Sequence, residues 1–414
     1  MPTVVAKLEA LQPALSITAQ ALGAPEDLPG LDASKLLITH STNLRELPPP
    51  EKLVFGQAST MTDHMLIVNY SPETGWSVPL IKPYAPLQLD PACSVFHYTP
   101  ALFEGMKAFL DPSGRPRLFR PDMNMRRMST SADRVALPHF DENELLKLIK
   151  KLVQLEARWI PKIQGYSLYI RPTMIGTRPA IGVAASTHAC LYVICSPTGP
   201  YFPTGYKPVS LWAEQDAVRS WPGGTGAYKL GINYAPCFKP QQEAARKGYQ
   251  QILWILGENQ QITEVGQMNF FAVFKRDDGA YDVVTPTLDG TILPGVTRNS
   301  VLALVRADDD SSPLANFQKT HKLYAHERQL TLPELQEMAD SGQLVEAFGV
   351  GTAAIICPIG RVGYQNKSTD ATHEIKMPEY KGGLGPLSTA LLESIVAIQE
   401  GRIEFEGWSQ TIDM

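Results

Sequence analysis

The chain has 414 residues, of which 44% are hydrophobic and 19% are charged, and its formal net charge at pH 7 is −5. This composition is typical of a soluble globular protein, and the length favours two domains over a single core. The mildly acidic balance gives no reason to expect nucleic acid or an anionic membrane as a partner. No apolar run approaches the length that spans a bilayer.

The cysteines and histidines predict neither a disulfide framework nor a metal site. The five cysteines are scattered without a close pair, which is typical of buried thiols in a reducing compartment. The eight histidines show no ligand spacing. The first residues do not resemble a secretory signal, and an arginine-rich transit peptide is a poor match because Arg45 is the first arginine. We expect a cytoplasmic protein, with a mitochondrial form as the alternative.

The first half of the chain is expected to form an extension and a smaller α/β domain. Residues 1–50 end in a proline run and are assigned to the extension, with a short amphipathic helix near residues 4–22. Strands are expected at residues 64–70, 94–98, 106–110, 117–120, 167–172 and 190–195, and helices from residue 121 and over 141–159. Proline and glycine cluster at residues 197–205, so we place the end of this domain, 51–200, there.

The second half is expected to form an interdomain loop, 201–215, and a larger α/β domain, 216–414. Helices are predicted at residues 239–247, 332–341 and 387–399, and strands at 251–256 and 262–274. Residues 291–305 are predicted to run from a strand into a helix. Residues 346–353 are predicted to be a glycine loop that leads into a buried strand.

Lys229 lies in an uncharged stretch, residues 223–236, that is rich in glycine and aromatic residues. The nearest charged residues along the chain are Arg219 and Lys239. Apolar surroundings lower the pKa of a lysine because burial disfavours the ammonium form. Such a lysine is a candidate for Schiff-base formation with a carbonyl group. The alternative is a lysine whose ammonium reaches out of a loop into solvent.

If the carbonyl belongs to pyridoxal phosphate, the sequence must also supply an acid for the ring nitrogen, a donor for the phenolic oxygen and a phosphate site. Glu264, the only charge on an apolar stretch, can be the acid, or it can be an exposed strand glutamate. Tyr234 can be the donor, or an ordinary core tyrosine. The glycine-containing segments 293–297 and 349–352 can bind phosphate through backbone amides, although turns use glycine for many purposes.

Together these segments resemble the branched-chain amino acid aminotransferases. This family comprises fold-type IV pyridoxal-phosphate enzymes, and the similarity is to its eukaryotic-type branch. The match runs from about residue 50 to the end with consistent spacing. It is carried by FEGMKAF at 103–109, RLFRP at 117–121, YIRP at 169–172, YKLGINY at 228–234, TEVG at 263–266, ILPGVTR at 292–298 and FGVGTA at 348–353. The resemblance implies two α/β domains joined by a loop, with the cofactor between them.

The resemblance also implies a role for individual residues. Lys229 would bind pyridoxal phosphate and transfer the proton, Glu264 would hold the ring nitrogen, Tyr234 the phenolic oxygen and Arg127 the phosphate. Further phosphate contacts would come from Gly295, Val296, Thr297 and Thr352. The substrate pocket would be lined by Phe55, Tyr98, Phe103, Tyr169, Arg171, Tyr201, Gln267 and Ala353. Its aromatic walls would enclose an aliphatic side chain, and Arg171 would receive the distal carboxylate of glutamate.

Two positions depart from the family pattern. Gln267 stands where close relatives carry a threonine that faces the substrate carboxylate, so the substrate range is the property that this change affects. Ala354 and Cys357 occupy the two positions of a redox C-x-x-C present in some animal members, so a thiol switch of that kind is not expected.

The activity implied is reversible amino transfer between L-leucine, L-isoleucine or L-valine and 2-oxoglutarate. One alternative is another fold-type IV activity, such as a D-amino acid or amine transaminase or a lyase. The other is a non-catalytic relative that only binds a ligand. The resemblance further implies a homodimer in which Tyr98 reaches the neighbouring site, and no metal.

Overall fold

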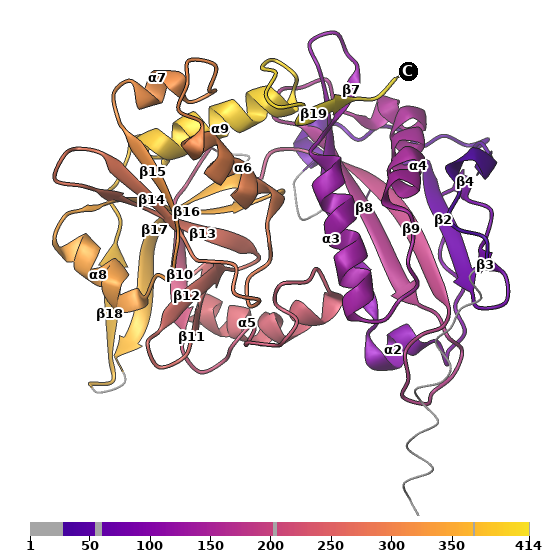
Figure 1. Cartoon of the computed structure of the whole chain (residues 1–414), viewed down its shortest axis with the longest axis horizontal. Coiled ribbons are helices and arrows are strands. Elements are labelled where there is room, and N and C mark those ends of the chain that lie inside the picture. Colours follow the sequence, from indigo (N-terminus) through magenta and orange to yellow (C-terminus); the bar gives the residue numbers. More distant parts are fainter. Residues whose placement is uncertain (1–27, 54–59, 202–204, 367–368, 414) are drawn as a thin grey trace, which may run out of the picture.

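The computed structural model describes residues 28–53, 60–201, 205–366 and 369–413. Two units of mixed helix and sheet lie side by side, one built from the first half of the chain and one from the second (Figure 1). The helix expected near residues 4–22 and the pocket residue Phe55 lie outside the described residues. No helix in the described part is long and apolar enough to cross a membrane.

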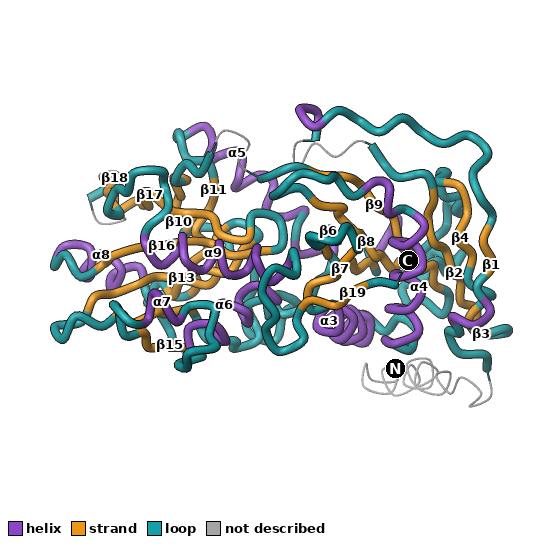
Figure 2. Tube along the Cα trace, turned by 90° about the horizontal axis from the view of Figure 1, so that it is seen from above, coloured by secondary structure: helices purple, strands orange, loops and turns teal. Residues whose placement is uncertain are grey.

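The first unit is organised around a mixed sheet with the order β1-β4-β2-β9-β8-β6-β7-β19, in which β3 pairs with β2 and β5 with β8. Its strands are β1 (Leu37–Ile38), β2 (His64–Ser71), β3 (Gly75–Trp76), β4 (Leu80–Pro83), β5 (Ala101–Phe103), β6 (Met106–Leu110), β7 (Pro116–Phe119), β8 (Ser167–Gly176), β9 (Ala189–Thr198) and β19 (Ser409–Thr411). The β1–β4 pair is parallel, whereas the other described pairs are antiparallel. Figure 2 shows β1 and β4 at the outer edge, away from the second unit.

Two helices, α3 (Pro121–Arg134) and α4 (Glu142–Leu155), contribute the apolar core of this unit together with the sheet. Helix α4 begins at Asp141, whose side chain accepts hydrogen bonds from the backbone N–H groups of Asn143 and Glu144. Its apolar residues recur at helical spacing, so one face is buried and the other carries lysines. A short helix, α2 (Ser94–Tyr98), lies outside this core.

The second unit has the order β12-β11-β10-β17-β16-β13-β14-β15, and β12 also pairs with β13, so six of these strands close into a barrel. The strands are β10 (Val209–Glu214), β11 (Gln251–Leu256), β12 (Gln261–Val265), β13 (Met268–Lys275), β14 (Tyr281–Thr285), β15 (Leu323–Glu327), β16 (Leu344–Gly351), β17 (Ile355–Asn366) and β18 (Ala371–Lys376). Strand β13 alternates between two cores: Phe270 and Ala272 belong to one, whereas Phe271 and Val273 belong to the other.

The helices of the second unit surround this sheet. They are α5 (Phe238–Arg246), α6 (Val296–Arg306), α7 (Ala315–Gln318), α8 (Leu332–Asp340) and α9 (Pro386–Gln399). The core that contains Phe271 and Val273 also includes residues of two of these helices. They are Leu387, Leu391 and Ile395 of α9 and Val301 of α6. This packing fixes the start of α6, which becomes one wall of the site described below.

The two ends of the described chain both belong to the first sheet. Leu31 is buried in the first core and β1 extends the sheet edge, so part of the segment assigned to the extension packs on the folded unit. At the other end, β19 leaves the second unit and pairs with β7. Arg117 of β7 donates hydrogen bonds to the hydroxyl and carbonyl oxygens of Ser409, which fastens this strand.

Several predicted elements were wrong in type or extent. Residues 209–214, expected within the interdomain loop, form strand β10 of the second sheet. Residues 94–98, expected as a strand, form helix α2. The single strand expected at 262–274 is the hairpin of β12 and β13, because Gly266 has a φ of +55° that ends the first strand. Residues 291–295 are not a strand and lead as a loop into α6. Residues 346–351, expected as a loop, belong to strand β16, and the turn follows at 352–354.

Candidate active site

Lys229 is held at the junction of the two units by its own backbone. Its N–H donates to the Ser131 hydroxyl of α3 at 2.9 Å, and its carbonyl accepts from the Phe103 N–H of β5 at 3.2 Å. The side chain is only partly exposed, and its Nζ donates to the Tyr234 hydroxyl at 3.2 Å. Tyr234 therefore lies directly beside the Lys229 amine.

Aromatic rings form the surroundings of the Lys229 amine. Its Nζ lies 4.9 Å from the centroid of the Phe103 ring, which is itself 5.0 Å from the Tyr234 ring. The lysine has no charged neighbour along the chain, but in space it interacts electrostatically with the buried carboxylates of Glu104 and Glu264. The sequence-based view of an electrostatically isolated lysine was thus incomplete.

Glu264 is buried, with a relative exposure of 2%, which excludes the exposed strand glutamate considered above. Its Oε1 accepts the Leu293 N–H at 2.9 Å and the Asn269 side-chain amide at 3.4 Å. The contact between Glu264 and Asn269 follows from the strand register, since Glu264 on β12 stands opposite Asn269 on β13. Burial raises the pKa of Glu264, and the opposing effect of Arg219 does not cancel that rise.

The other carboxylate oxygen, Oε2, is the distinctive atom of this site. It is buried and receives no hydrogen bond from the described residues, although Nε of Arg219 lies 2.9 Å away. The Arg219 side chain is 4% exposed, and its Nη1 also has no hydrogen-bond partner among those residues. Two neighbouring buried polar atoms that lack hydrogen bonds mark a place where a ligand group fits, even though the two side chains form an ion pair.

Arg127 of α3 is buried and forms a bidentate ion pair with Glu104. Its Nε donates to Glu104 Oε1 at 2.7 Å and its Nη2 donates to Oε2 at 2.8 Å. The Arg127 charge and hydrogen bond outweigh burial and hold the pKa of Glu104 below its usual value. Nη1 of Arg127 donates to the Pro294 carbonyl at 3.0 Å, which connects α3 to the segment before α6.

The start of α6 forms a cradle of backbone groups. Gly295 precedes the helix, and no side chain caps its first N–H groups. A Cβ at Gly295 would stand 2.0 Å from Oδ1 of Asn269, so only glycine fits there. A small cavity reaches this helix start and is lined in part by Lys107, Val296, Thr297 and Thr352. Free N–H groups at a helix start are suited to binding an anion.

The predicted substrate residues divide into two groups. Arg171 lies against Phe103, with 4.7 Å from its guanidinium carbon to the ring centroid, and donates to the Tyr169 hydroxyl at 2.9 Å. Ala353 joins this region because its carbonyl accepts from Nζ of Lys107 at 2.8 Å. Phe103 lies beside Lys229, so Arg171, which contacts Phe103, is near the lysine as well.

Three other predicted pocket residues lie at the surface of the described chain. The Tyr98 side chain is exposed, and its hydroxyl donates to the Ile181 carbonyl. Tyr201 is 37% exposed. Gln267 is exposed in the turn between β12 and β13. Their roles at the substrate stay predictions.

Sequence reasoning missed three charged residues of the site, namely Glu104, Lys107 and Arg219. Glu104 and Lys107 lie inside a motif that was noted for its resemblance, but nothing in their spacing shows that they face Arg127 or Ala353. Arg219 was noted only as the nearest charge before Lys229. Each acts through a partner far away in the chain, which a single sequence does not reveal.

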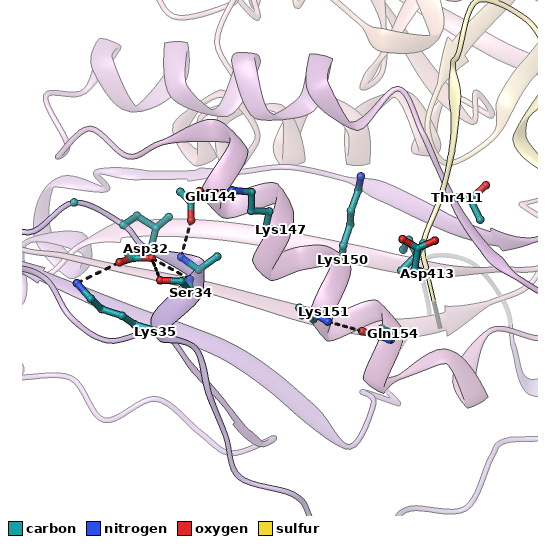
Figure 3. Close-up of a pocket in the computed structure, with 14 residues that line it drawn as sticks. Asp32, Ser34, Lys35, Glu144, Lys147, Lys150, Lys151, Gln154, Thr411 and Asp413 are labelled. Atoms are coloured by element: carbon teal, nitrogen blue, oxygen red, sulfur yellow. Dashed lines mark hydrogen bonds and ion pairs between the residues drawn. The ribbon is translucent and has the colours of Figure 1, made fainter.

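A separate hollow of about 800 Å³ lies where both ends of the described chain approach α4 (Figure 3). It is lined by Lys35, Lys147, Lys150 and Lys151, but these amines already contact Asp32, Glu144, Gln410 and Gln154. None of the predicted site residues lines it. The surroundings of Lys229 therefore remain the candidate active site.

Comparison with known proteins identifies the family of the chain. Residues 101–362 match the family model of class IV aminotransferases. The mitochondrial branched-chain-amino-acid aminotransferase of Saccharomyces cerevisiae is 48% identical over 399 residues, covering 96% of each chain. The cytosolic enzyme of that yeast is 47% identical over 92% of this chain and 98% of its own length. The cytosolic enzyme of Mus musculus is 44% identical over 92% of this chain and 94% of its own length.

Solved structures support the fold at lower sequence identity. A branched-chain amino acid aminotransferase from Thermobaculum terrenum, in its pyridoxal-phosphate form, aligns with a TM-score of 0.63 at 21% identity, covering 85% of this chain and 99% of that one. The Escherichia coli enzyme aligns with a TM-score of 0.61 at 21% identity, covering 85% and 99%. The fold is that of the fold-type IV enzymes. The chain accordingly belongs to the class IV aminotransferases, within the family of branched-chain amino acid aminotransferases.

Proposed function

We propose that this protein is a pyridoxal-phosphate-dependent transaminase that moves an amino group reversibly between L-leucine, L-isoleucine or L-valine and 2-oxoglutarate. The observation that carries the proposal is the arrangement around Lys229. Its amine contacts Tyr234, and the partly buried lysine interacts electrostatically with a carboxylate whose Oε2 receives no hydrogen bond from the described residues. A protein that only binds a ligand needs no such set.

Membership of the class IV aminotransferases implies pyridoxal phosphate as the cofactor, and the site fits this group. Oε2 of Glu264 forms an ion pair with Arg219 but accepts no hydrogen bond from the described residues, so it can accept one from a protonated ring nitrogen. The Tyr234 hydroxyl, already beside Nζ of Lys229, is the natural partner of the phenolic oxygen. The α6 start at Gly295, where a Cβ has no room, offers backbone N–H groups to a phosphate.

The chain's own groups then perform the reaction. The cofactor supplies a carbonyl that takes the amino group and a ring that withdraws electrons. Lys229 Nζ, as a neutral amine, accepts the α-proton of the substrate and later returns a proton. Glu264, as a carboxylate, would hold a cation at the ring nitrogen, and its hydrogen bonds with Leu293 and Asn269 fix the carboxylate. Arg171 offers its guanidinium to the distal carboxylate of the amino-group acceptor.

The aromatic side chains beside Lys229 favour an aliphatic substrate. Phe103 and Tyr234 present ring surfaces close to the amine, and ring surfaces exclude water from a branched side chain. Arg171 lies against both Phe103 and Tyr169, so one pocket combines an apolar wall with a cation. This combination suits a transaminase that binds leucine and glutamate in turn.

The proposed working form is a homodimer. Four large apolar side chains are exposed here. In α2, Phe96 is 58% and Tyr98 is 40% exposed, and in the adjoining loop Ile181 is 69% and Val183 is 85% exposed. The hydrogen bond from Tyr98 to Ile181 joins them in one surface. Apolar surface of this kind marks a contact between proteins, and a second copy covering it would bring Tyr98 to the neighbouring pocket.

The activity is tested by the absorbance of the purified protein. The bound cofactor is expected to give a yellow band that L-leucine bleaches and 2-oxoglutarate restores, because the two half-reactions oppose each other. A yellow protein that responds to D-alanine and ignores L-leucine would retain the cofactor but assign another fold-type IV activity. A colourless protein that takes up no cofactor would favour a non-catalytic relative.

Glu264→Gln is expected to lower turnover roughly 100-fold or more while some cofactor remains bound, since a neutral amide does not stabilise a cation at the ring nitrogen. The measurement is kcat with L-leucine together with cofactor content. Glu337→Gln on α8 makes the same substitution at an exposed position and serves as the control. An unchanged turnover in Glu264→Gln would remove the ring-nitrogen role.

The compartment stays a prediction. The relatives named above include both cytosolic and mitochondrial enzymes. We propose the cytoplasm, and the test is the location of the full-length protein in fractionated cells.

A further inference from the structure

The charge at the proposed phosphate cradle does not come from Arg127 alone. Both Nε and Nη2 of Arg127 are bonded to the fully buried Glu104, so the two side chains together are close to electrically neutral. Glu104 also accepts from Asn124, which keeps it in place. Arg127 retains N–H groups for hydrogen bonds, but its positive charge is already compensated. A phosphate dianion bound here therefore requires a second source of positive charge.

Lys107 is positioned to be that source. It lies on β6 and is 9% exposed. It lines the same small cavity as Val296, Thr297 and Thr352, at the start of α6. Its Nζ donates to the Ala353 carbonyl at 2.8 Å, so the amine is directed across the boundary between the two units.

The surroundings of Lys107 favour a nearby anion. Burial lowers the pKa of Lys107 to about 7, because the interior disfavours the charged ammonium form. An anion in the cavity would favour the ammonium form, and the ammonium would in turn hold the anion. The sheet fixes this position, because Lys107 stands opposite Tyr169 in the β6–β8 register.

We propose that Lys107 is a phosphate-binding residue of the cofactor site, which supplies the positive charge that Glu104 compensates at Arg127. The inference rests on the proposed function, since it assumes that the cofactor phosphate occupies the start of α6. The same amine also donates a hydrogen bond to the Ala353 carbonyl. It lets Lys107 hold the turn at 352–354 against the cradle.

The experiment compares two ligands that differ only in the phosphate. Affinities of the cofactor-free full-length protein for pyridoxal 5′-phosphate and for pyridoxal are measured by spectrophotometric titration. Lys107→Gln removes the charge but keeps a donor for Ala353, whereas Lys107→Arg keeps the charge. Lys107→Met is the second neutral variant, should the glutamine variant not fold. Lys150→Gln, in the hollow of Figure 3, removes one lysine charge away from the site and is the matched control.

Lys107→Gln is expected to weaken pyridoxal 5′-phosphate binding by roughly 10- to 100-fold, the effect of a charge-assisted contact, and to change pyridoxal binding by less than about twofold. Lys107→Arg should retain most of the preference for the phosphorylated ligand, and Lys150→Gln all of it. Equal losses for both ligands, or no loss for either, would overturn the role of Lys107 alone. Wild-type protein that binds neither ligand would overturn the proposed function as well.

Discussion

Lys229→Ala is expected to abolish transamination, with turnover lowered by about four orders of magnitude or more, because the amine both attaches the cofactor and moves the substrate proton. The replacement removes the contact of Nζ with Tyr234 but leaves the backbone bonds to Ser131 and Phe103 intact, so the fold should persist. The measurement is kcat with L-leucine and 2-oxoglutarate. Borohydride reduction followed by mass spectrometry should label the peptide with Lys229 in the wild type and not in the variant.

Lys239→Ala is the matched control for this prediction. Lys239 lies on α5, ten positions further along the chain, and its side chain is 85% exposed. Its loss should leave turnover within about twofold, because an exposed lysine contributes little to a distant site. Turnover of Lys229→Ala within tenfold of the wild type would contradict the assignment of the catalytic amine.

Glu104→Gln is expected to destabilise the protein by about 3 to 5 kcal/mol, the cost of removing one partner from a buried ion pair. The substitution leaves the Arg127 guanidinium, which is 8% exposed, without a counter-charge. It also weakens the hydrogen bonds that the carboxylate accepts from Asn124 and the Gly105 N–H. The free energy of unfolding in urea measures the effect.

Glu243→Gln removes a carboxylate from an exposed pair with Lys239 and provides the comparison. A surface pair of this type contributes about 0 to 1 kcal/mol, so the two variants should differ several-fold in their effect. If Glu104→Gln were no more destabilising than Glu243→Gln, the Arg127–Glu104 pair would not be the buried anchor described here.

Much of the fold follows from local pattern. Strand β11 and helix α9 carry apolar runs of the right period and length, and their predicted bounds differ from the observed ones by at most one residue. The helix α2 was missed because its five residues mix apolar and polar side chains in a way that also suits a strand. The β12–β13 turn was missed because a single glycine, Gly266, inside an apolar run also suits a bulge in one continuous strand.

The candidate site was accessible from the sequence mainly through the resemblance. Lys229, Tyr234, Glu264 and Arg127 are individually ambiguous, since each residue type is common in roles unrelated to catalysis. The structure adds what depends on tertiary contacts, such as the Arg219 guanidinium beside Glu264 and the Glu104 carboxylate on Arg127. Contacts across such separations are set by the packing of whole units, so no local pattern encodes them.

The pairing of β19 with β7 has a consequence for how the protein can be divided. The polypeptide passes from the first sheet to the second between β9 and β10 and returns after α9. A fragment that stops before Ser409 therefore lacks an edge strand of the first sheet, and one that begins after β9 carries a strand with no sheet to join. The first half alone therefore lacks one strand of its sheet, so a gene fusion that exchanges one half for that of a relative must carry residues 409–411 together with the first half.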